Sequence, residues 1–391
     1  MMNLLWLPAW YPNRIEPFTG DFLQRHARAV SLYHQVRVIN IVRDKEGAIT
    51  RQVHRDEQET FQLKETTIYY YSPSFIFKPA EKLLSSLRYR KLYRRAIKAY
   101  LEEEGPPAAV HVHIAGKNGW MALWLKRRFG IPYVITEHWG GYLTAAKPNF
   151  SQLSLLLRWM WRKVMKKAAG ISVVSRHLGY ALEALQPGIS FSVIPNVVDS
   201  NLFYPLPAAT RKGPFQFIHI STLTYQKNPE DIFRAFALVK QTSPAFRLSV
   251  FGPPAPALRQ LAVELGLQDE IQFHEEVPQR VLAGYLRQAD ALILYSRYET
   301  FGCVLIEANA CGIPAIVSDL AVHHETIQEG VNGYFAEGEN AVALAQKINW
   351  FMQEADRGSK EAIAVAARVK YNYERIGQLF TGFYTGHIET K

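Results

Sequence analysis

The feature that most constrains the fold is the alternation of short apolar runs with amphipathic stretches of helical periodicity. The runs are β-branched or almost continuously apolar, as in parallel strands that are covered on both faces. They are NLLWLPAW, QVRVINIV, AVHVHI, YVITEH, GISVVS and FSVIPN, then FQFIHIS, RLSVFG, IQFHE, ALILYS, PAIVSD and NGYFAE. Helical patterns such as PEDIFRAFALVKQ and RVLAGYLRQA lie between them. This alternation predicts an α/β protein, and so many strands predict two doubly wound parallel sheets.

The length of the chain also indicates two domains. Its 391 residues exceed the usual size of a single hydrophobic core. Residues 201–214 (NLFYPLPAATRKGP) are rich in proline and small residues and separate the two groups of predicted strands. We therefore expect one domain over residues 1–200 and a second over residues 201–370.

Composition and the start of the chain predict a cytoplasmic protein. Hydrophobic residues make up 48% of the sequence, but no apolar run approaches the roughly 18 residues that span a bilayer. The first residues lack the basic region and the cleavage site of a signal peptide. Only Cys303 and Cys311 are present, which is too few for a disulfide framework and fits a reducing compartment.

Charge is distributed unevenly along the chain. The net charge is +10 overall, +13 in residues 1–200 and −3 in residues 201–391. This asymmetry indicates that the first half meets an anionic partner, which could be a nucleic acid, a membrane or a phosphate-bearing substrate. A soluble surface that is simply basic explains the same numbers.

Two basic stretches, 88–101 (RYRKLYRRAIKAYL) and 155–170 (LLLRWMWRKVMKKAAG), carry much of this charge. Apolar and aromatic residues recur in them at helical spacing, as in helices that lie on an anionic bilayer. Their aromatic residues include Tyr89, Tyr93, Tyr100, Trp159 and Trp161. Core helices with solvated basic faces would show the same pattern, so both interpretations remain open.

Several common active-site motifs are missing from the sequence. No G-x-G-x-x-G follows an early strand, and neither a Walker A motif nor a G-x-S-x-G elbow occurs. Histidine and cysteine residues never adopt the spacing of a metal site along the chain. These absences disfavour nicotinamide dehydrogenases, P-loop NTPases and α/β-hydrolases.

The stretch YETFGCVLIEANACGIP places two carboxylates, Glu299 and Glu307, eight positions apart. Glu299 falls in the turn after a predicted strand, where open parallel sheets bind ligands. The amides of Gly302, Cys303 and Val304 would form a helix N-terminus suited to an anion. Eight residues of helix advance about 12 Å, well beyond the roughly 5 Å between the carboxylates of a retaining glycosidase. The two carboxylates are therefore expected to bind different parts of one long ligand.

These residues lie in the part of the chain that most specifically resembles the retaining, GT-B-fold glycosyltransferases of family four. ADALILYSRYETFGCVLIEANACGIPAIVSD is similar to the E-x7-E signature of that family. ISTLTYQKNPEDIFRAFALVK, IQFHEEVPQRVLAGYLRQAD, WYPNRIEPFTGDFLQRHARAV, YVITEHWGG and VIPNVVD resemble other family segments. The resemblance implies two Rossmann-like domains that face a central cleft, with residues 371–391 packing back on the first domain.

The resemblance also assigns roles to individual residues. Glu299 would contact hydroxyl groups of the donor sugar, and Glu307 the ribose of the nucleotide. Lys227 would neutralise the diphosphate, with help from the amides of Gly302 to Val304. His138 would reach the donor sugar from the opposite domain, and Gly20 would lie where donor and acceptor meet.

Two departures from the family pattern affect the donor site. Ser221-Thr222 stands where the family commonly has Gly-Arg, so Thr222 replaces a diphosphate-binding arginine. Lys227 would then carry more of the charge, or Arg297 or another basic residue would assist it. Ala321 and Val322 replace a common Gly-Gly, which leaves the donor sugar open.

The resemblance implies a retaining hexosyltransferase that uses a UDP- or GDP-linked sugar. We expect no cofactor and no metal, because no Asp-x-Asp suited to a divalent ion is present. The expected acceptor is a glycan or lipid-linked molecule in bacterial surface polysaccharide synthesis, reached from the inner face of an anionic membrane. Alternatives are a GT-B enzyme with a soluble acceptor and a sugar-nucleotide epimerase. Nucleic-acid binding is disfavoured, because its motifs are missing.

Overall fold

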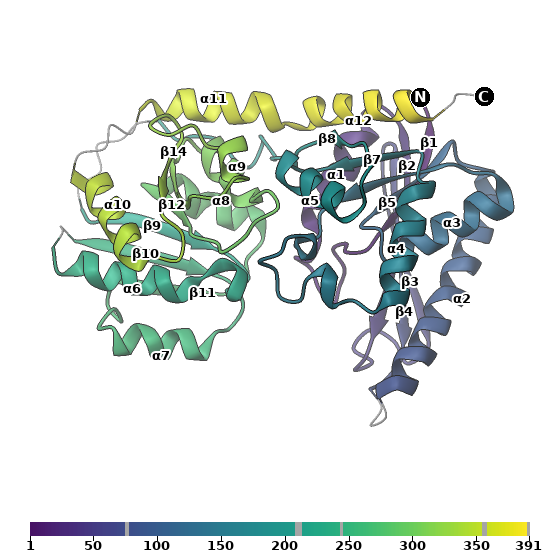
Figure 1. Ribbon diagram of the computed structural model, residues 1–391, viewed down its shortest axis with the longest axis horizontal. Coiled ribbons are helices and arrows are strands. Elements are labelled where there is room, and N and C mark those ends of the chain that lie inside the picture. Colours follow the sequence, from purple (N-terminus) through teal and green to yellow (C-terminus); the bar gives the residue numbers. More distant parts are fainter. Residues whose placement is uncertain (75–77, 208–212, 243–244, 354–357, 389–391) are drawn as a thin grey trace.

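The structure is a computed structural model that describes residues 1–74, 78–207, 213–242, 245–353 and 358–388. Two α/β units lie side by side, each built around one sheet (Figure 1). The first sheet has eight strands in the order β3-β4-β2-β1-β5-β6-β7-β8, and the second has six in the order β11-β10-β9-β12-β13-β14. The predicted α/β class with two doubly wound sheets is confirmed.

The N-terminal sheet is covered by helices on both faces, which is why its central strands are buried along their whole length. Its strands are β1 (Asn3–Pro8), β2 (Gln35–Asp44), β3 (Val53–Thr60), β4 (Leu63–Tyr71), β5 (Ala109–His113), β6 (Tyr133–Glu137), β7 (Gly170–Val173) and β8 (Ser192–Val193). Its helices are α1 (Asp21–Ser31), α2 (Lys78–Glu104), α3 (Lys117–Phe129), α4 (Leu155–Lys167) and α5 (Arg176–Leu185).

The C-terminal sheet is parallel throughout. Its strands are β9 (Phe215–Ile220), β10 (Phe246–Phe251), β11 (Ile271–His274), β12 (Ala291–Leu294), β13 (Ala315–Ser318) and β14 (Gly333–Ala336). Its helices are α6 (Pro229–Lys240), α7 (Pro256–Glu264), α8 (Gln279–Gln288), α9 (Cys303–Ala310) and α10 (Ala341–Gln353). Helix α9 is apolar on most sides and almost wholly buried, so it anchors the signature segment rigidly against the sheet.

Each of the twelve predicted runs contains a strand, but the sequence analysis missed the pair β3–β4. These two strands are antiparallel and form an edge of the first sheet, as an exception to the expected parallel arrangement. Strand β3 has the sequence VHRDEQET and is exposed along nearly its whole length. A strand that buries so little apolar surface has no hydrophobic signature, which explains why β3 was missed. Strand β4 is largely buried, so this reason does not apply to it.

Two helices at the end of the chain connect the domains. α11 (Lys360–Tyr371) packs on α9, and α12 (Tyr373–His387) packs on α1, so together they cross the molecule along one side (Figure 1). The packing of α12 is close, because a Cβ on Gly377 would lie 2.3 Å from the carbonyl oxygen of Ala29. Phe380 and Tyr384 of α12 are buried in the same cluster as β1.

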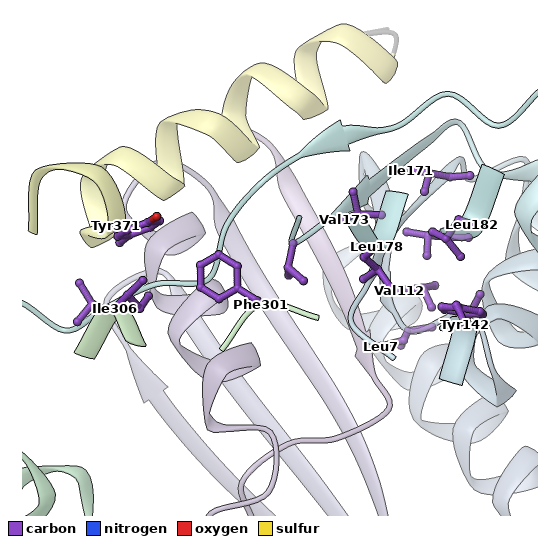
Figure 2. Close-up of a cluster of buried hydrophobic side chains, with 14 of the residues drawn as sticks. Leu7, Val112, Tyr142, Ile171, Val173, Leu178, Leu182, Phe301, Ile306 and Tyr371 are labelled. Atoms are coloured by element: carbon purple, nitrogen blue, oxygen red, sulfur yellow. The ribbon is translucent and has the colours of Figure 1, made fainter. Parts of the chain in front are cut away.

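A single apolar cluster also links the two domains (Figure 2). It contains Leu7 and Val112 of the first sheet together with Phe301 and Ile306 of the second domain. Phe301 meets Tyr371 edge to face, with 5.9 Å between the ring centroids. The domains are therefore joined by packed side chains as well as by the chain itself.

The two basic helices behave differently from the expectation for membrane-surface helices. Tyr93, Tyr100 and Trp161 are buried in the core, so the prediction that they are interfacial aromatic residues is wrong. Trp159, by contrast, is 52% exposed. Within the described ranges, none of the helices combines the length and the apolar character that crossing a bilayer requires.

Candidate functional site

A cavity of about 570 Å³ lies between the two domains. Its walls come from the loops that follow β1 and β6 in the first domain and β9, β10 and β12 in the second. All of these loops leave the carboxyl ends of parallel strands, where doubly wound sheets bind ligands. Glu299, His138 and Lys227 all line this cavity, so residues far apart in the sequence meet at one site.

Glu299 and Lys227 form an ion pair within the C-terminal domain. The Lys227 ammonium donates to Oε2 of Glu299, and the amide of Thr300 donates to Oε1 at 3.0 Å. Glu299 is only 5% exposed, and burial opposes its ionisation. The charge and hydrogen bond of Lys227 outweigh burial and hold the pKa of Glu299 below its usual value. The site therefore contains a charged pair before any ligand binds.

The start of α9 forms the adjoining wall of the cavity. Gly302 caps this helix with φ 84° and ψ 71°, a left-handed conformation that favours glycine. Gly302, Cys303 and Val304 all line the cavity, which places a helix N-terminus toward a ligand. Burial raises the pKa of Cys303 to about 12, so its thiol stays protonated and contributes no charge.

Glu307 lies deeper and is paired across the cavity with Arg25 of α1. Nη1 of Arg25 donates to Oε1 of Glu307 at 2.7 Å, and both side chains are buried. Arg25 also meets Asp21 at 3.4 Å, and Gln279 donates to Asp21 from the C-terminal domain. Burial raises the pKa of Glu307 to about 7, while the Arg25 charge acts in the opposite direction. The network bridges the two domains.

Arg25 is a site residue that the sequence analysis missed. The available signal is its position in DFLQRHARAV, where it falls among the buried residues of an amphipathic helix. A fully buried arginine is rare unless it is paired. The partner is 282 positions away, however, so the sequence alone could not supply it.

His138 belongs to a cluster of three buried histidines with His26 and His113. Nδ1 of His113 lies 3.3 Å from Nε2 of His138, and each of the three rings offers a nitrogen within 4.8 Å of the others. Burial lowers the pKa of all three side chains, so the rings are neutral. Among the described residues, this is the one cluster of three or more His, Cys, Asp or Glu that is close enough to hold a metal ion.

Gly20 and Thr222 occupy different positions at the cavity. Gly20 has φ 75° and precedes α1, and a Cβ there would lie 2.5 Å from the carbonyl carbon of Trp10. It shapes the loop after β1 and is set back from the cavity. Thr222 lines the cavity, with its hydroxyl 3.3 Å from that of Thr224.

Arg297 does not replace the family arginine in this structure. Its Nη1 donates to the carbonyl of Tyr225 at 2.7 Å, and its Nε lies 3.6 Å from Glu339, which directs the guanidinium away from the cavity. Arg25 and Lys147 line the cavity together with Lys227. These are the cations that could supplement Lys227.

Comparison with known proteins identifies the family. Residues 23–202 match the family described as Glycosyltransferase Family 4, and residues 207–370 match the family described as Glycosyl transferases group 1. The chain belongs to the family 4 glycosyltransferases. Both halves of this glycosyltransferase are therefore covered, and the resemblance seen in the signature segment is confirmed.

Relatives of this glycosyltransferase include two enzymes with different names. A D-inositol 3-phosphate glycosyltransferase from Thermobispora bispora is 25% identical over 73% of this chain and 72% of its own length. An N-acetyl-alpha-D-glucosaminyl L-malate synthase from Bacillus anthracis is 26% identical over 70% of this chain and 74% of its own length.

Solved structures confirm the GT-B fold. A sucrose-phosphate synthase from Thermosynechococcus elongatus superposes with a TM-score of 0.78 at 20% identity, covering 98% of each chain. The Anabaena protein HepE, solved in complex with UDP and glucose, gives a TM-score of 0.70 at 16% identity, covering 99% of this chain and all of its own.

Proposed function

We propose that this glycosyltransferase moves a hexose from a UDP- or GDP-linked sugar to a glycan or lipid-linked acceptor, with retention of anomeric configuration, in bacterial surface polysaccharide synthesis. The observation that carries the proposal is the Glu299–Lys227 pair beside the N-terminus of α9, inside the cavity between the domains. HepE, a structural relative, binds UDP and glucose, which supports a nucleotide-sugar donor.

The proposed mechanism follows from the charges that develop as the bond between the sugar and the nucleotide breaks. As the bond between the sugar and the nucleotide breaks, the anomeric carbon becomes positive and the diphosphate oxygen takes the electron pair. Lys227 and the amides at the start of α9 stabilise that oxygen. The ionised Glu299 binds sugar hydroxyls and favours positive charge nearby. The leaving oxygen accepts the proton of the acceptor hydroxyl, which attacks from the same face.

Lys227 must gain a second partner when the donor binds. Its ammonium group is bonded to Glu299 in the donor-free structure, whereas the proposed role requires contact with the diphosphate. An ammonium has three donor hydrogens, so it can retain Glu299 while it binds phosphate oxygen. The donor thereby enters a site that is already charged and oriented.

Transfer is proposed to need no metal, because Lys227, Arg25 and the helix N-terminus supply positive charge at the cavity. Activity in EDTA decides this point, and we expect it to equal the activity in Mg²⁺. Loss of activity in EDTA, restored by Zn²⁺, would contradict the proposal and direct attention to His26, His113 and His138.

The acceptor is proposed to reside at an anionic membrane surface. Arg94, Arg95, Arg162 and Lys166 are exposed on α2 and α4, and each basic residue near such a surface contributes on the order of 1 kcal/mol. Reversing these four charges should release the protein from anionic vesicles, as should high salt, without changing UDP affinity. Equal sedimentation of the variant and the unaltered protein would contradict this location.

A soluble acceptor is the second candidate, since the names of two relatives mention inositol 3-phosphate and malate. A sugar-nucleotide epimerase is a third possibility on the same fold. A thermal-shift screen over UDP- and GDP-linked sugars selects the donor, because a ligand specific for the folded state raises its apparent stability. NMR of the product then shows whether the anomeric configuration is retained. Inversion, or product formed without an acceptor, would overturn the proposal.

A further inference from the structure

A second cavity of about 410 Å³ lies wholly within the N-terminal domain. It is enclosed by α2, α3 and α4 and by the loops after β1, β5 and β6. Trp10 and Trp139 line both this cavity and the one between the domains, so the two adjoin. A ligand that reaches from one to the other would place its reacting end beside the donor site.

The wall of the second cavity is aromatic, and the polar atoms of three of its rings are already bonded to the protein. The Tyr89 hydroxyl donates to Oδ1 of Asn118. Nε1 of Trp161 donates to the Tyr142 hydroxyl at 2.8 Å, and that hydroxyl donates to Glu137 at 2.8 Å. These three rings therefore offer few hydrogen bonds to the hydroxyl groups of a sugar, and their faces form an apolar wall. It suits a hydrocarbon instead.

Exposed apolar side chains continue from this cavity to the surface. Leu157 of α4 lines the cavity and is still 48% exposed. Further exposed residues lie close to it along α4, and others are on the same part of α2 as Ser86, which also lines the cavity. They are Leu155, Leu156 and Trp159 on α4, and Leu83, Leu84 and Leu87 on α2.

Basic residues also line the second cavity. Arg90 and Lys117 are themselves lining residues of the second cavity. The Lys117 ammonium lies 5.6 Å from the centre of the Tyr89 ring, which keeps a cation against the aromatic wall. An anionic group attached to a hydrocarbon would therefore meet a cation beside this wall.

We propose that the second cavity binds the hydrocarbon chain of a lipid-phosphate acceptor. This inference rests on the proposed function, because it assigns a chemical class to the acceptor of that transfer. The chain lies among Tyr89, Trp120 and Trp161, the phosphate meets Arg90 or Lys117, and the hydroxyl that receives the sugar points past Trp139 toward Glu299. Each methylene that enters the cavity increases affinity about fourfold.

Binding of octyl, decyl and dodecyl phosphate below their micelle concentrations tests the proposal by calorimetry. We expect affinity to rise with chain length, and a terminal bromine on the chain to quench tryptophan fluorescence. Ser86→Phe, which narrows the opening, and Leu157→Gln, which makes it polar, should each weaken dodecyl phosphate binding about tenfold. Leu32→Gln is a matched control, since Leu32 is 46% exposed in the same domain but far from the cavity along the chain.

The possible outcomes separate this inference from the function on which it rests. Affinity that is independent of chain length, or equal in Ser86→Phe, Leu157→Gln and Leu32→Gln, would overturn the cavity assignment even if nucleotide sugars bind. Stronger binding of a free oligosaccharide than of dodecyl phosphate would assign the cavity to a sugar instead. If dodecyl phosphate binds as expected but no nucleotide sugar is turned over, the proposed transfer fails and the hydrocarbon site stands. UDP affinity reports whether each variant is folded.

Discussion

Glu299 and Glu307 belong to the same segment, yet one is paired inside its own domain and the other across the cavity. Glu299 meets Lys227 from the same α/β unit, whereas Glu307 meets Arg25 from α1 of the other unit. The first pair is independent of how the domains are oriented. The second exists only while the domains are close. The two carboxylates of one motif therefore differ in what they are sensitive to. Glu299 is sensitive to the charge at the reacting end of the site, and Glu307 is sensitive to closure of the two domains.

The largest effect is expected for Glu299→Gln. It removes the charge that favours the transition state but keeps the size of the side chain, so turnover should fall roughly 100- to 1000-fold. UDP affinity should remain within a few-fold, because the proposed contact is with the sugar. Calorimetry and steady-state kinetics measure both quantities. Glu275→Gln, at an exposed position, provides a control for loss of a nearby charge. Equal losses of turnover and UDP affinity would contradict the separation of roles.

The next largest effect is expected on the free energy of unfolding, when the Arg25–Glu307 pair between the domains is broken. Arg25→Met leaves Glu307 buried without its partner, and we expect the free energy of unfolding to fall by about 3 kcal/mol. Arg28→Met, at an exposed position three residues along α1, should change it by less than about 0.5 kcal/mol.

A double variant sharpens this prediction. Arg25→Met combined with Glu307→Leu removes both buried charges and should recover most of the lost stability. Denaturant unfolding monitored by fluorescence and by circular dichroism measures these values. If the double variant is less stable than Arg25→Met alone, the pair is not the source of the effect.

Loss of the Glu307 carboxylate should weaken nucleotide binding without removing it. We expect Glu307→Ala to reduce UDP affinity roughly tenfold, because two ribose hydroxyls would lose a charged acceptor. A 2′,3′-dideoxy analogue of UDP has no such hydroxyls, so it should bind the variant and the unaltered protein equally. A tenfold loss for the analogue as well would show that Glu307 acts through the domain interface instead.

The smallest expected effect is the change of stability and of UDP affinity with pH. The pKa of Glu307 is raised to about 7, above the value of about 4.3 in an unfolded chain. Between these two pKa values the Glu307 carboxyl is protonated in the folded protein but ionised in the unfolded chain. The contribution of Glu307 to stability therefore falls as pH rises from about 4.5 to 7. UDP affinity should change the other way: we expect a few-fold loss as pH falls from 8 to 6, because a protonated carboxyl is a poorer acceptor. Glu307→Gln should abolish this dependence, and an unchanged profile would refute it.

Much of the fold could be predicted because each strand and helix carries its own local pattern. The runs from NLLWLPAW to NGYFAE are apolar by themselves, and Gly302 follows the turn that starts α9. Arg25 and the histidine cluster could not be found in this way, since their contacts join distant segments. The exposed strand β3 was missed for the opposite reason, because it buries too little to leave a pattern. Sequence spacing thus located the signature loop. It could not identify Arg25, which contacts this segment from the other domain.

The position of α12 has a consequence for biosynthesis. Ile376, Phe380 and Tyr384 share a buried cluster with Leu4 and Trp6, so the core of the first domain contains side chains that are translated after the whole C-terminal sheet. Domains generally fold in order as the chain emerges from the ribosome. In this protein the strands of the N-terminal domain are translated first, but the core of that domain is completed only after the C-terminal sheet has been translated. Until α12 arrives, α1 and the neighbouring edge of that core present an uncovered apolar face. We therefore expect the nascent chain to bind a chaperone at the ribosomal exit.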